Sequence, residues 1–167
     1  MKSVTVDTNT VDNARVVEAA RRAGFDIVRT TVTDRELESS GIQMALPEHQ
    51  PLYEPLVLGE SRLGFAALGS QEIADTFEKL LQIISNGSFP AKARRSNLSS
   101  GEKRQLRDAM ILSTHIRERR QIFVTNDAKG FIDGGRREHL QREFGTRIMT
   151  AEEFLMLCES ASDTGAV

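Results

Sequence analysis

Short β-rich runs alternate along this chain with stretches of helical periodicity, and this alternation restricts its fold more than any other feature. Apolar and β-branched runs occur at 4–6, 25–28, 122–124 and 147–149. Apolar spacing and polar caps predict helices over 11–24, 34–40, 71–84, 100–120, 136–144 and 151–158. Strands separated by helices are typical of βαβ units, so we expect an α/β fold with a mainly parallel sheet.

The middle of the chain, residues 41–98, is less regular. Three of the four prolines fall within residues 41–70, where a hairpin and two short helices are alternative interpretations, and a basic loop is expected at 89–98. A chain of 167 residues suits one domain with its own core. We therefore predict a single domain over 1–158, with this extended middle segment, and a disordered tail at 159–167.

The composition is that of a soluble globular protein, with 39% hydrophobic and 28% charged residues. No stretch resembles a membrane span, and the polar start of the chain argues against a secretory signal. Cys158 is the single cysteine and cannot form an internal disulfide. We expect it to be a half-buried helix residue in a protein of the reducing cytoplasm.

The net charge of −2 hides a strong asymmetry. Residues 91–147 contain 14 Lys and Arg against 7 Asp and Glu, whereas the rest of the chain carries 8 against 17. A clustered positive face binds phosphate backbones, although runs of charge are more often only solvated surface. The basic half therefore indicates a polyanionic partner if the fold gathers its cations.

Four acids are expected to converge. Asp7 directly follows the first strand and Asp127 closely follows the run at 122–124, so both should lie beyond the carboxyl ends of parallel strands. Asp108 lies inside a helix near apolar neighbours, and Glu36 lies where a helix begins. Singly, they could be a helix cap, a turn former, the partner of an arginine and a surface acid. Together, such carboxylates repel one another unless a divalent ion, Mg²⁺ or Mn²⁺, lies between them.

These segments resemble the PIN domain family of metal-dependent ribonucleases. The resemblance rests on VDTN at 6–9, EL at 36–37, DAMI at 108–111, VTND at 124–127 with Phe131, and the closing TRIMTAEEFL at 146–155. It implies a three-layer α/β/α sandwich that cleaves RNA endonucleolytically with Mg²⁺ or Mn²⁺. The acidic cluster would be Asp7, Glu36, Asp108 and Asp127. The supporting residues would be Asn9, Thr125 and Asn126, and the candidates for RNA contact are Arg104, Arg107 and Lys129.

Several alternatives stay open at this point. Glu38 could replace Glu36, Asp133 could replace Asp127, and Glu60 is a further candidate. The family includes toxins of bacterial toxin–antitoxin pairs, which raises an antitoxin-like partner and a homodimer as options. Residues 41–98 are longer than the equivalent part of the small toxins, which argues against a toxin role.

Other motifs carry less weight. His49, His115 and His139 are too scattered for a zinc site; we expect His115 to be packed or partly exposed, and Gly134 with Gly135 to form a turn. The DTNT run at 7–10 is also similar to the nucleophile loop of haloacid dehalogenase-like phosphatases, but Asn9 stands where that family has its second acid. A non-catalytic RNA-binding or scaffold domain is the remaining alternative. Retention of all four acids argues against that alternative.

Overall fold

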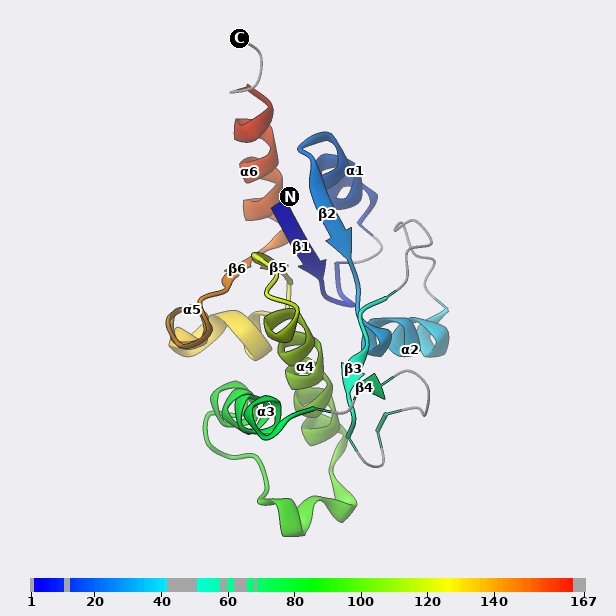
Figure 1. Cartoon of the computed structure of the whole chain (residues 1–167), viewed down its shortest axis with the longest axis vertical. Helices are drawn as coiled ribbons and strands as arrows, with labels where there is room; N and C mark the ends of the chain where they lie inside the picture. Colours follow the sequence, from blue (N-terminus) through cyan, green and yellow to red (C-terminus); the bar gives the residue numbers. More distant parts are fainter. Residues whose placement is uncertain are drawn as a thin grey trace.

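A four-stranded, all-parallel sheet forms the centre of the molecule (Figure 1). The computed structural model describes residues 2–10, 13–41, 51–57, 60–61, 66–67 and 69–163. Within these, the strand order is β2 (Phe25–Val28), β1 (Lys2–Val6), β5 (Ile122–Val124) and β6 (Arg147–Met149). The predicted α/β fold with a parallel sheet is confirmed.

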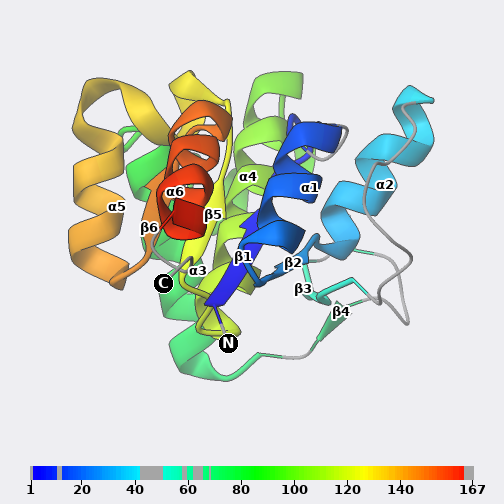
Figure 2. The ribbon, with the colours of Figure 1, turned by 90° about the horizontal axis from the view of Figure 1, so that it is seen from above.

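Helices cover both faces of this sheet (Figure 2). One face carries α1 (Ala14–Arg22) and α6 (Ala151–Asp163), and the other carries α3 (Gln71–Ile84), α4 (Ser100–Arg117) and α5 (Arg136–Phe144). Helix α2 (Thr31–Ser40) lies beyond the end of β2. The arrangement is consistent with a three-layer α/β/α sandwich.

The period of two along each strand divides the core between the layers. Val4 and Val6 of β1 pack with α1 and α6, and Phe25 of β2 meets Phe154 of α6 edge to face at 5.3 Å between ring centroids. Phe123 of β5 points to the opposite side, where its ring meets that of Phe131 at 5.1 Å. Both faces of the sheet are therefore buried, as expected for parallel strands.

A buried polar link crosses the α4 side of the sheet. The ring of His115, on α4, has no exposed surface, and its two nitrogens lie 3.0 Å from the Thr5 hydroxyl and 2.6 Å from the Thr146 hydroxyl. Burial is the main reason that its pKa falls to about 3, and the nearby Arg120 adds to the effect. His115 is thus a neutral packing residue, in line with the prediction.

Polar caps set several helix ends, and some predicted ends were wrong. The capping box of Ser99 and Glu102 starts α4 as expected. Helix α1 starts only after Asn13, whose side chain accepts hydrogen bonds from the amides of residues 15 and 16. Helix α2 starts at Thr31, three residues before the predicted start at Asp34, because the Thr30 side chain accepts from the amide of residue 33.

Helix C-termini also differ from the prediction. Helix α1 ends at Arg22 with Ala23 as its C-cap, and Gly24, predicted to be the cap, follows with a φ of +72°. Helix α4 ends at Arg117 and not at residue 120, because Glu118 is its C-cap and Arg119 has a φ of +50°. Helix α6 continues to residue 163, so the predicted disordered tail is wrong up to that point, and 164–167 lie outside the described residues.

The middle segment contains pairing that was not predicted. Strands β3 (Glu54–Pro55) and β4 (Ala66–Ala67) pair in parallel, which excludes a hairpin between them because hairpin strands are antiparallel. A 3₁₀ helix, η1 (Lys92–Asn97), occupies most of the predicted basic loop. The remaining predictions for residues 42–50, 58–59, 62–65 and 68 fall outside the described residues.

Two further points concern burial. Cys158 is 2% exposed and belongs to the core between α1 and α6, so the prediction of a half-buried residue was wrong. Helix α6 continues past residue 158, so Cys158 lies within the helix, on the face that packs into the core. None of the helices in the described ranges is both long and apolar enough to cross a membrane.

The connections after β5 are tight. A single π-type turn, η2 (Ala128–Ile132), leads into the 3₁₀ turn η3 (Asp133–Gly135). Gly134 and Gly135 have φ values of +65° and +77°, a region that glycine enters without steric penalty, so the predicted turn is confirmed. The chain order reverses between β1 and β5, since β1 is followed by β2 on one side and joined by β5 on the other. Ligand sites of open α/β sheets lie at such a point.

Candidate functional site

The four predicted acids line one pocket at the carboxyl edge of the sheet. This pocket has a volume of about 460 Å³ and is lined by Asp7, Glu36, Asp108 and Asp127, with Thr8, Asn9, Ser39, Ser40, Arg104 and Arg107. Asp7 follows β1, Asp127 follows β5, Glu36 belongs to α2 and Asp108 to the middle of α4. Asp7, Asp108 and Asp127 are 4%, 8% and 8% exposed. The fold therefore brings together acids that are up to 120 positions apart in the sequence.

Asp7 is fixed in direction by two hydrogen bonds. The amide of Thr8 donates to Asp7 Oδ1 at 2.8 Å, and the hydroxyl of Thr125 donates to Asp7 Oδ2 at 2.7 Å. Thr125 Oγ1 in turn accepts from the Asp127 amide at 3.0 Å and from Asn9 Nδ2 at 3.4 Å. One hydroxyl thus connects the ends of β1 and β5, which is the supporting position predicted for Thr125.

The two asparagines support the same junction. Asn9 Oδ1 accepts from the Asn126 amide at 2.9 Å, and Asn126 Oδ1 accepts from the Ala151 amide at 3.1 Å. Asn126 therefore connects the turn after β5 to the start of α6. These contacts agree with the supporting roles that the sequence indicated for both residues.

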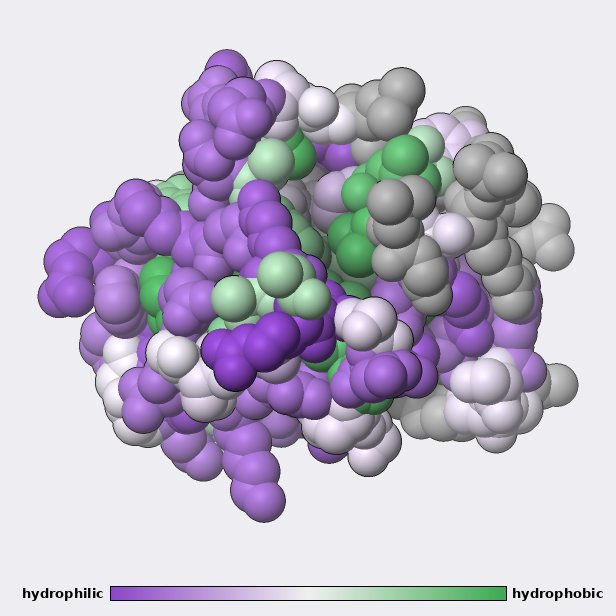
Figure 3. Space-filling view, turned by 90° about the horizontal axis from the view of Figure 1, so that it is seen from below, coloured by the Kyte–Doolittle hydropathy of each residue, from purple (hydrophilic) through white to green (hydrophobic). Residues whose placement is uncertain are grey.

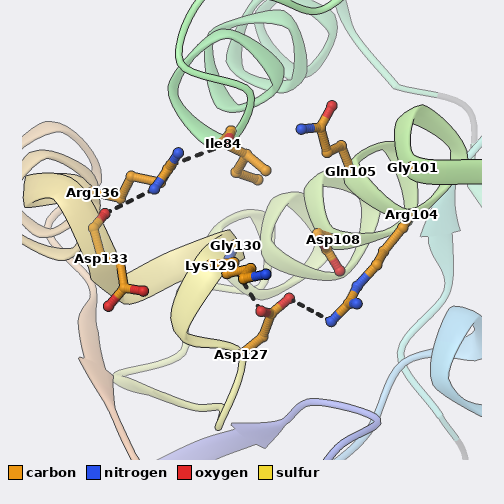
Figure 4. A pocket seen from close by; sticks show the side chains of 10 residues that line it. All are labelled: Ile84, Gly101, Arg104, Gln105, Asp108, Asp127, Lys129, Gly130, Asp133 and Arg136. Carbon is orange, nitrogen blue, oxygen red and sulfur yellow. Dashed lines mark hydrogen bonds and ion pairs between the residues drawn. The ribbon is translucent and has the colours of Figure 1, made fainter.

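Gly130 leaves space for two of the carboxylates. Its amide donates to Asp127 Oδ1 at 3.1 Å. A Cβ atom placed on Gly130 would lie 2.8 Å from Asp127 Oδ2 and 3.3 Å from Asp108 Oδ2. Both oxygens therefore face the same small space above the glycine (Figure 4), and a larger residue would have to displace one of them. The sequence offered no sign of this role, because the need for glycine comes from two carboxylates that are close in space and not from the backbone angles of Gly130.

Burial and mutual repulsion raise the pKa of two of the acids. Burial raises the pKa of Asp7 to about 6, against the opposing hydrogen bonds from Thr125 and Thr8, and Glu36 and Asp127 contribute by repulsion. Burial likewise raises the pKa of Asp108 well above its usual range, with further contributions from Asp7 and Asp127. No hydrogen bond to the Asp108 carboxylate occurs within the described ranges. Ionisation of these two acids is therefore unfavourable in the folded protein.

Arg104 and Arg107 of α4, the two arginines named as candidates for RNA contact, line the pocket with these acids. Arg104 has a 68% exposed side chain that reaches back to Asp127, with Nη2 at 3.1 Å from Oδ2 (Figure 4). Arg107 forms an ion pair with Glu60 at 3.1 Å. Glu60, a further candidate for the site, therefore neutralises an arginine, and it does not line the pocket.

The structure also shows where the remaining candidate residues lie relative to the pocket. Glu38 is exposed and does not line the pocket that holds Glu36. Asp133 lines an adjoining pocket, of which Asp127 is also part. His139 lies on α5 and His115 in the core, so neither reaches the acids, and His49 lies outside the described residues.

Half of the expected positive face is neutralised, since seven of its 14 cations form ion pairs with acids of the described residues. Among the cations of residues 91–147, the ones that form ion pairs with acids are Lys92 and Arg95 with Glu78, Arg104 with Asp127, Arg107 with Glu60, Arg117 with Glu118, Arg120 with Asp26 and Arg137 with Glu153. Figure 3 shows the molecule from the end toward which β1 points in Figure 1, and the described side chains on this surface are mainly hydrophilic. The sequence could not predict this pairing, since most partners come from other elements.

The donor set suits a hard divalent cation. Carboxylate oxygens are the ligands that Mg²⁺ and Mn²⁺ prefer, and a cation would offset the burial and the repulsion that together raise the pKa of Asp7 and Asp108. Among the described residues, however, no group of three or more His, Cys, Asp or Glu side chains closes around a single point as a metal site would. The acids face a common pocket, and the cation nearest to them is Arg104.

Thr8, which sequence reasoning missed, links two of the acids. In addition to its amide contact with Asp7, its hydroxyl donates to Glu36 Oε2 and so ties the end of β1 to α2. Its position directly after Asp7 was the one available signal.

The sequence matches no known protein-family model, and a search of curated proteins finds no significant match.

Proposed function

We propose that this protein is a Mg²⁺- or Mn²⁺-dependent endoribonuclease of the PIN type. The observation that carries the proposal is the pocket in which four carboxylates from four separate elements meet at the switch point of the sheet. Folding buries this charge although Asp7 and Asp108 resist ionisation there. A protein retains such an unfavourable arrangement more readily at a functional site than as part of its scaffold.

The side chains of the pocket have separate tasks under this proposal. Among the described residues, each Asp7 oxygen accepts one hydrogen bond and keeps capacity for another contact, and the Asp108 carboxylate accepts none. Asp7, Glu36, Asp108 and Asp127 would hold the metal. A bound divalent ion supplies a water of lowered pKa and neutralises charge on the phosphate. Arg104 can leave Asp127 without breaking a buried contact, because its side chain is mostly exposed, and can then face the phosphate.

The test is cleavage of a fluorescently labelled single-stranded RNA by the purified protein. We expect cleavage with Mn²⁺ or Mg²⁺ and none with EDTA, and Asp108→Asn should reduce the rate by at least about 100-fold while the protein stays folded. Glu38→Gln is the matched control, because this exposed acid of the same charge lies close to Glu36 in sequence but outside the pocket. Cleavage by Asp108→Asn at the parent rate would refute the proposal. Salt-sensitive RNA binding with no cleavage by the parent would favour a binding module instead.

A further inference from the structure

A second pocket adjoins the acidic cluster (Figure 4). Its volume is about 460 Å³, and it shares Arg104, Asp108 and Asp127 with the first pocket. The two pockets therefore form a continuous depression that passes across the carboxylates. A ligand long enough to fill both would lie over the acids at its middle.

Arg136, the first residue of α5, lines the second pocket and is held by main-chain oxygens. Its Nε donates to the carbonyl of Ile84 at 3.1 Å, and its Nη1 donates to the carbonyl of Asp133 at 2.9 Å. In the part of the chain that the structure describes, no carboxylate forms an ion pair with it. The carboxylate of Asp133 points away from the guanidinium (Figure 4). Arg136 is therefore held by two elements, is not neutralised by a carboxylate of the described residues and has N–H groups to spare.

Lys129 is the second cation of this pocket. It belongs to η2, is exposed, and makes no hydrogen bond or ion pair with the described residues. The arginines of the first pocket differ, since Arg104 lies on Asp127 and Arg107 on Glu60. Among the cations that line the two pockets, Arg136 and Lys129 are therefore the ones not paired with a carboxylate of the described residues.

We infer that the second pocket is a phosphate subsite in which Arg136 and Lys129 bind an internal phosphate of a single-stranded RNA, next to the linkage that lies over the acids. A guanidinium offers two parallel N–H donors to a phosphate, and an ammonium adds a point charge. The inference rests on the proposed function for its choice of RNA, whereas the position and charge of the pocket are independent of that choice. It places a well-held phosphate on the α5 side of the acids.

Binding can be measured apart from cleavage. Anisotropy of a labelled single-stranded RNA in EDTA reports affinity when no metal supports hydrolysis. Lys129→Gln and Arg136→Gln should each weaken binding by roughly 3- to 10-fold at moderate salt and lower the slope of log K against log salt by about 1. Arg142→Gln is the matched control, because it removes the same charge from an exposed position of the same helix outside the pocket.

Two comparisons distinguish loss of phosphate binding from partial unfolding and from binding of the RNA terminus. Arg136→Gln loses two hydrogen bonds and could unfold part of α5, so Lys129→Gln, which loses none, is expected to keep the parent melting temperature. An RNA with a single uncharged methylphosphonate linkage, moved along the strand, should lose affinity for the parent at one internal position, and the loss at that position should be smaller for Lys129→Gln, which keeps only Arg136 at this phosphate. Dependence on a 5′-terminal phosphate alone would overturn the assignment to an internal linkage.

The possible failures can be told apart. Parent-like affinity and salt slope in both Lys129→Gln and Arg136→Gln would refute the subsite, even if the parent cleaves RNA with metal. No RNA binding by the parent would refute it as well. A parent that binds RNA through these two cations but cleaves nothing with Mn²⁺ or Mg²⁺ would support the subsite and refute the proposed nuclease.

Discussion

Replacing Asp7 by asparagine should stabilise the metal-free protein at neutral and higher pH. The pKa of Asp7 rises from 3.8 to about 6 on folding, chiefly through burial. At about 1.4 kcal/mol per pKa unit, this shift means that folding with an ionised Asp7 costs about 3 kcal/mol. Asparagine carries no charge to bury. It loses one of the two good contacts with Thr8 and Thr125, at about 1 kcal/mol, so a net gain of about 2 kcal/mol is expected.

The dependence of this gain on pH follows from the sign of the shift. Because the folded-state pKa is raised, the native protein binds more protons than the unfolded chain between pH 3.8 and about 6. The stability that the parent owes to a protonated Asp7 is complete below this window and is lost as the pH rises through it. Asp7→Asn should therefore match or fall slightly below the parent near pH 4 and exceed it above pH 6.

Urea denaturation at pH 5 and pH 8 in EDTA measures the effect. For a chain of this length, 2 kcal/mol corresponds to a melting temperature higher by roughly 4 to 8 °C at pH 8. Asp75→Asn, which neutralises an exposed acid on α3, is the control and should change stability by no more than about 0.5 kcal/mol. Saturating Mn²⁺ should stabilise the parent more than the variant. An Asp7→Asn variant less stable than the parent at pH 8 in EDTA would refute the reasoning.

Three further substitutions test other contacts. Gly130→Ala should disturb Asp127, whose Oδ2 would lie 2.8 Å from the new methyl group; we expect a loss of about 1 to 3 kcal/mol by urea denaturation and lower cleavage, and parent-like values for both would contradict the packing. His115→Gln removes a group whose folded-state pKa is lowered to about 3, which costs the parent stability as pH falls below 6.5. On acidification from pH 6.5 to 4, the stability of His115→Gln relative to that of the parent should accordingly rise, and a pH profile identical to that of the parent would count against this. Arg120→Ala removes the donor to the carbonyls of residues 4 and 26, so calorimetry should show a loss of about 2 to 4 kcal/mol, and a loss below 0.5 kcal/mol would argue that water replaces it.

The sequence predicted the sheet and the convergence of the acids well, for a physical reason. An apolar run that stops at a carboxylate, as at Val6 with Asp7 and shortly after Val124 with Asp127, marks the end of a buried strand. Parallel strands place these ends at one edge. The burial of Asp108 followed from its apolar helical neighbours. These inferences needed only local patterns and one rule of topology.

Contacts between distant side chains could not be predicted in this way. Arg104 was expected to bind RNA, yet it lies on Asp127, and that geometry depends on the angle between α4 and the end of β5. The early start of α2 was missed because the run from Thr30 to Thr33 consists of β-branched residues, which favour strands, until the Thr30 side chain caps the helix. The short pairing of β3 with β4 carries no periodicity that a sequence pattern could register.

The position of β5 bears on how the chain folds as it is synthesised. This strand lies between β1 and β6 in space, yet more than 110 residues separate it from β1. A nascent chain that has not yet extruded residue 124 leaves an edge of β1 bare and lacks Phe131, one of the buried rings of the core on the α4 side. Ribosome-stalled chains shorter than this should be degraded readily by protease, and chains that also expose residues 125–158, which complete both cores, should resist it. The acidic pocket cannot form before Asp127 has emerged, so under the proposed function the nascent chain would not cleave its own message.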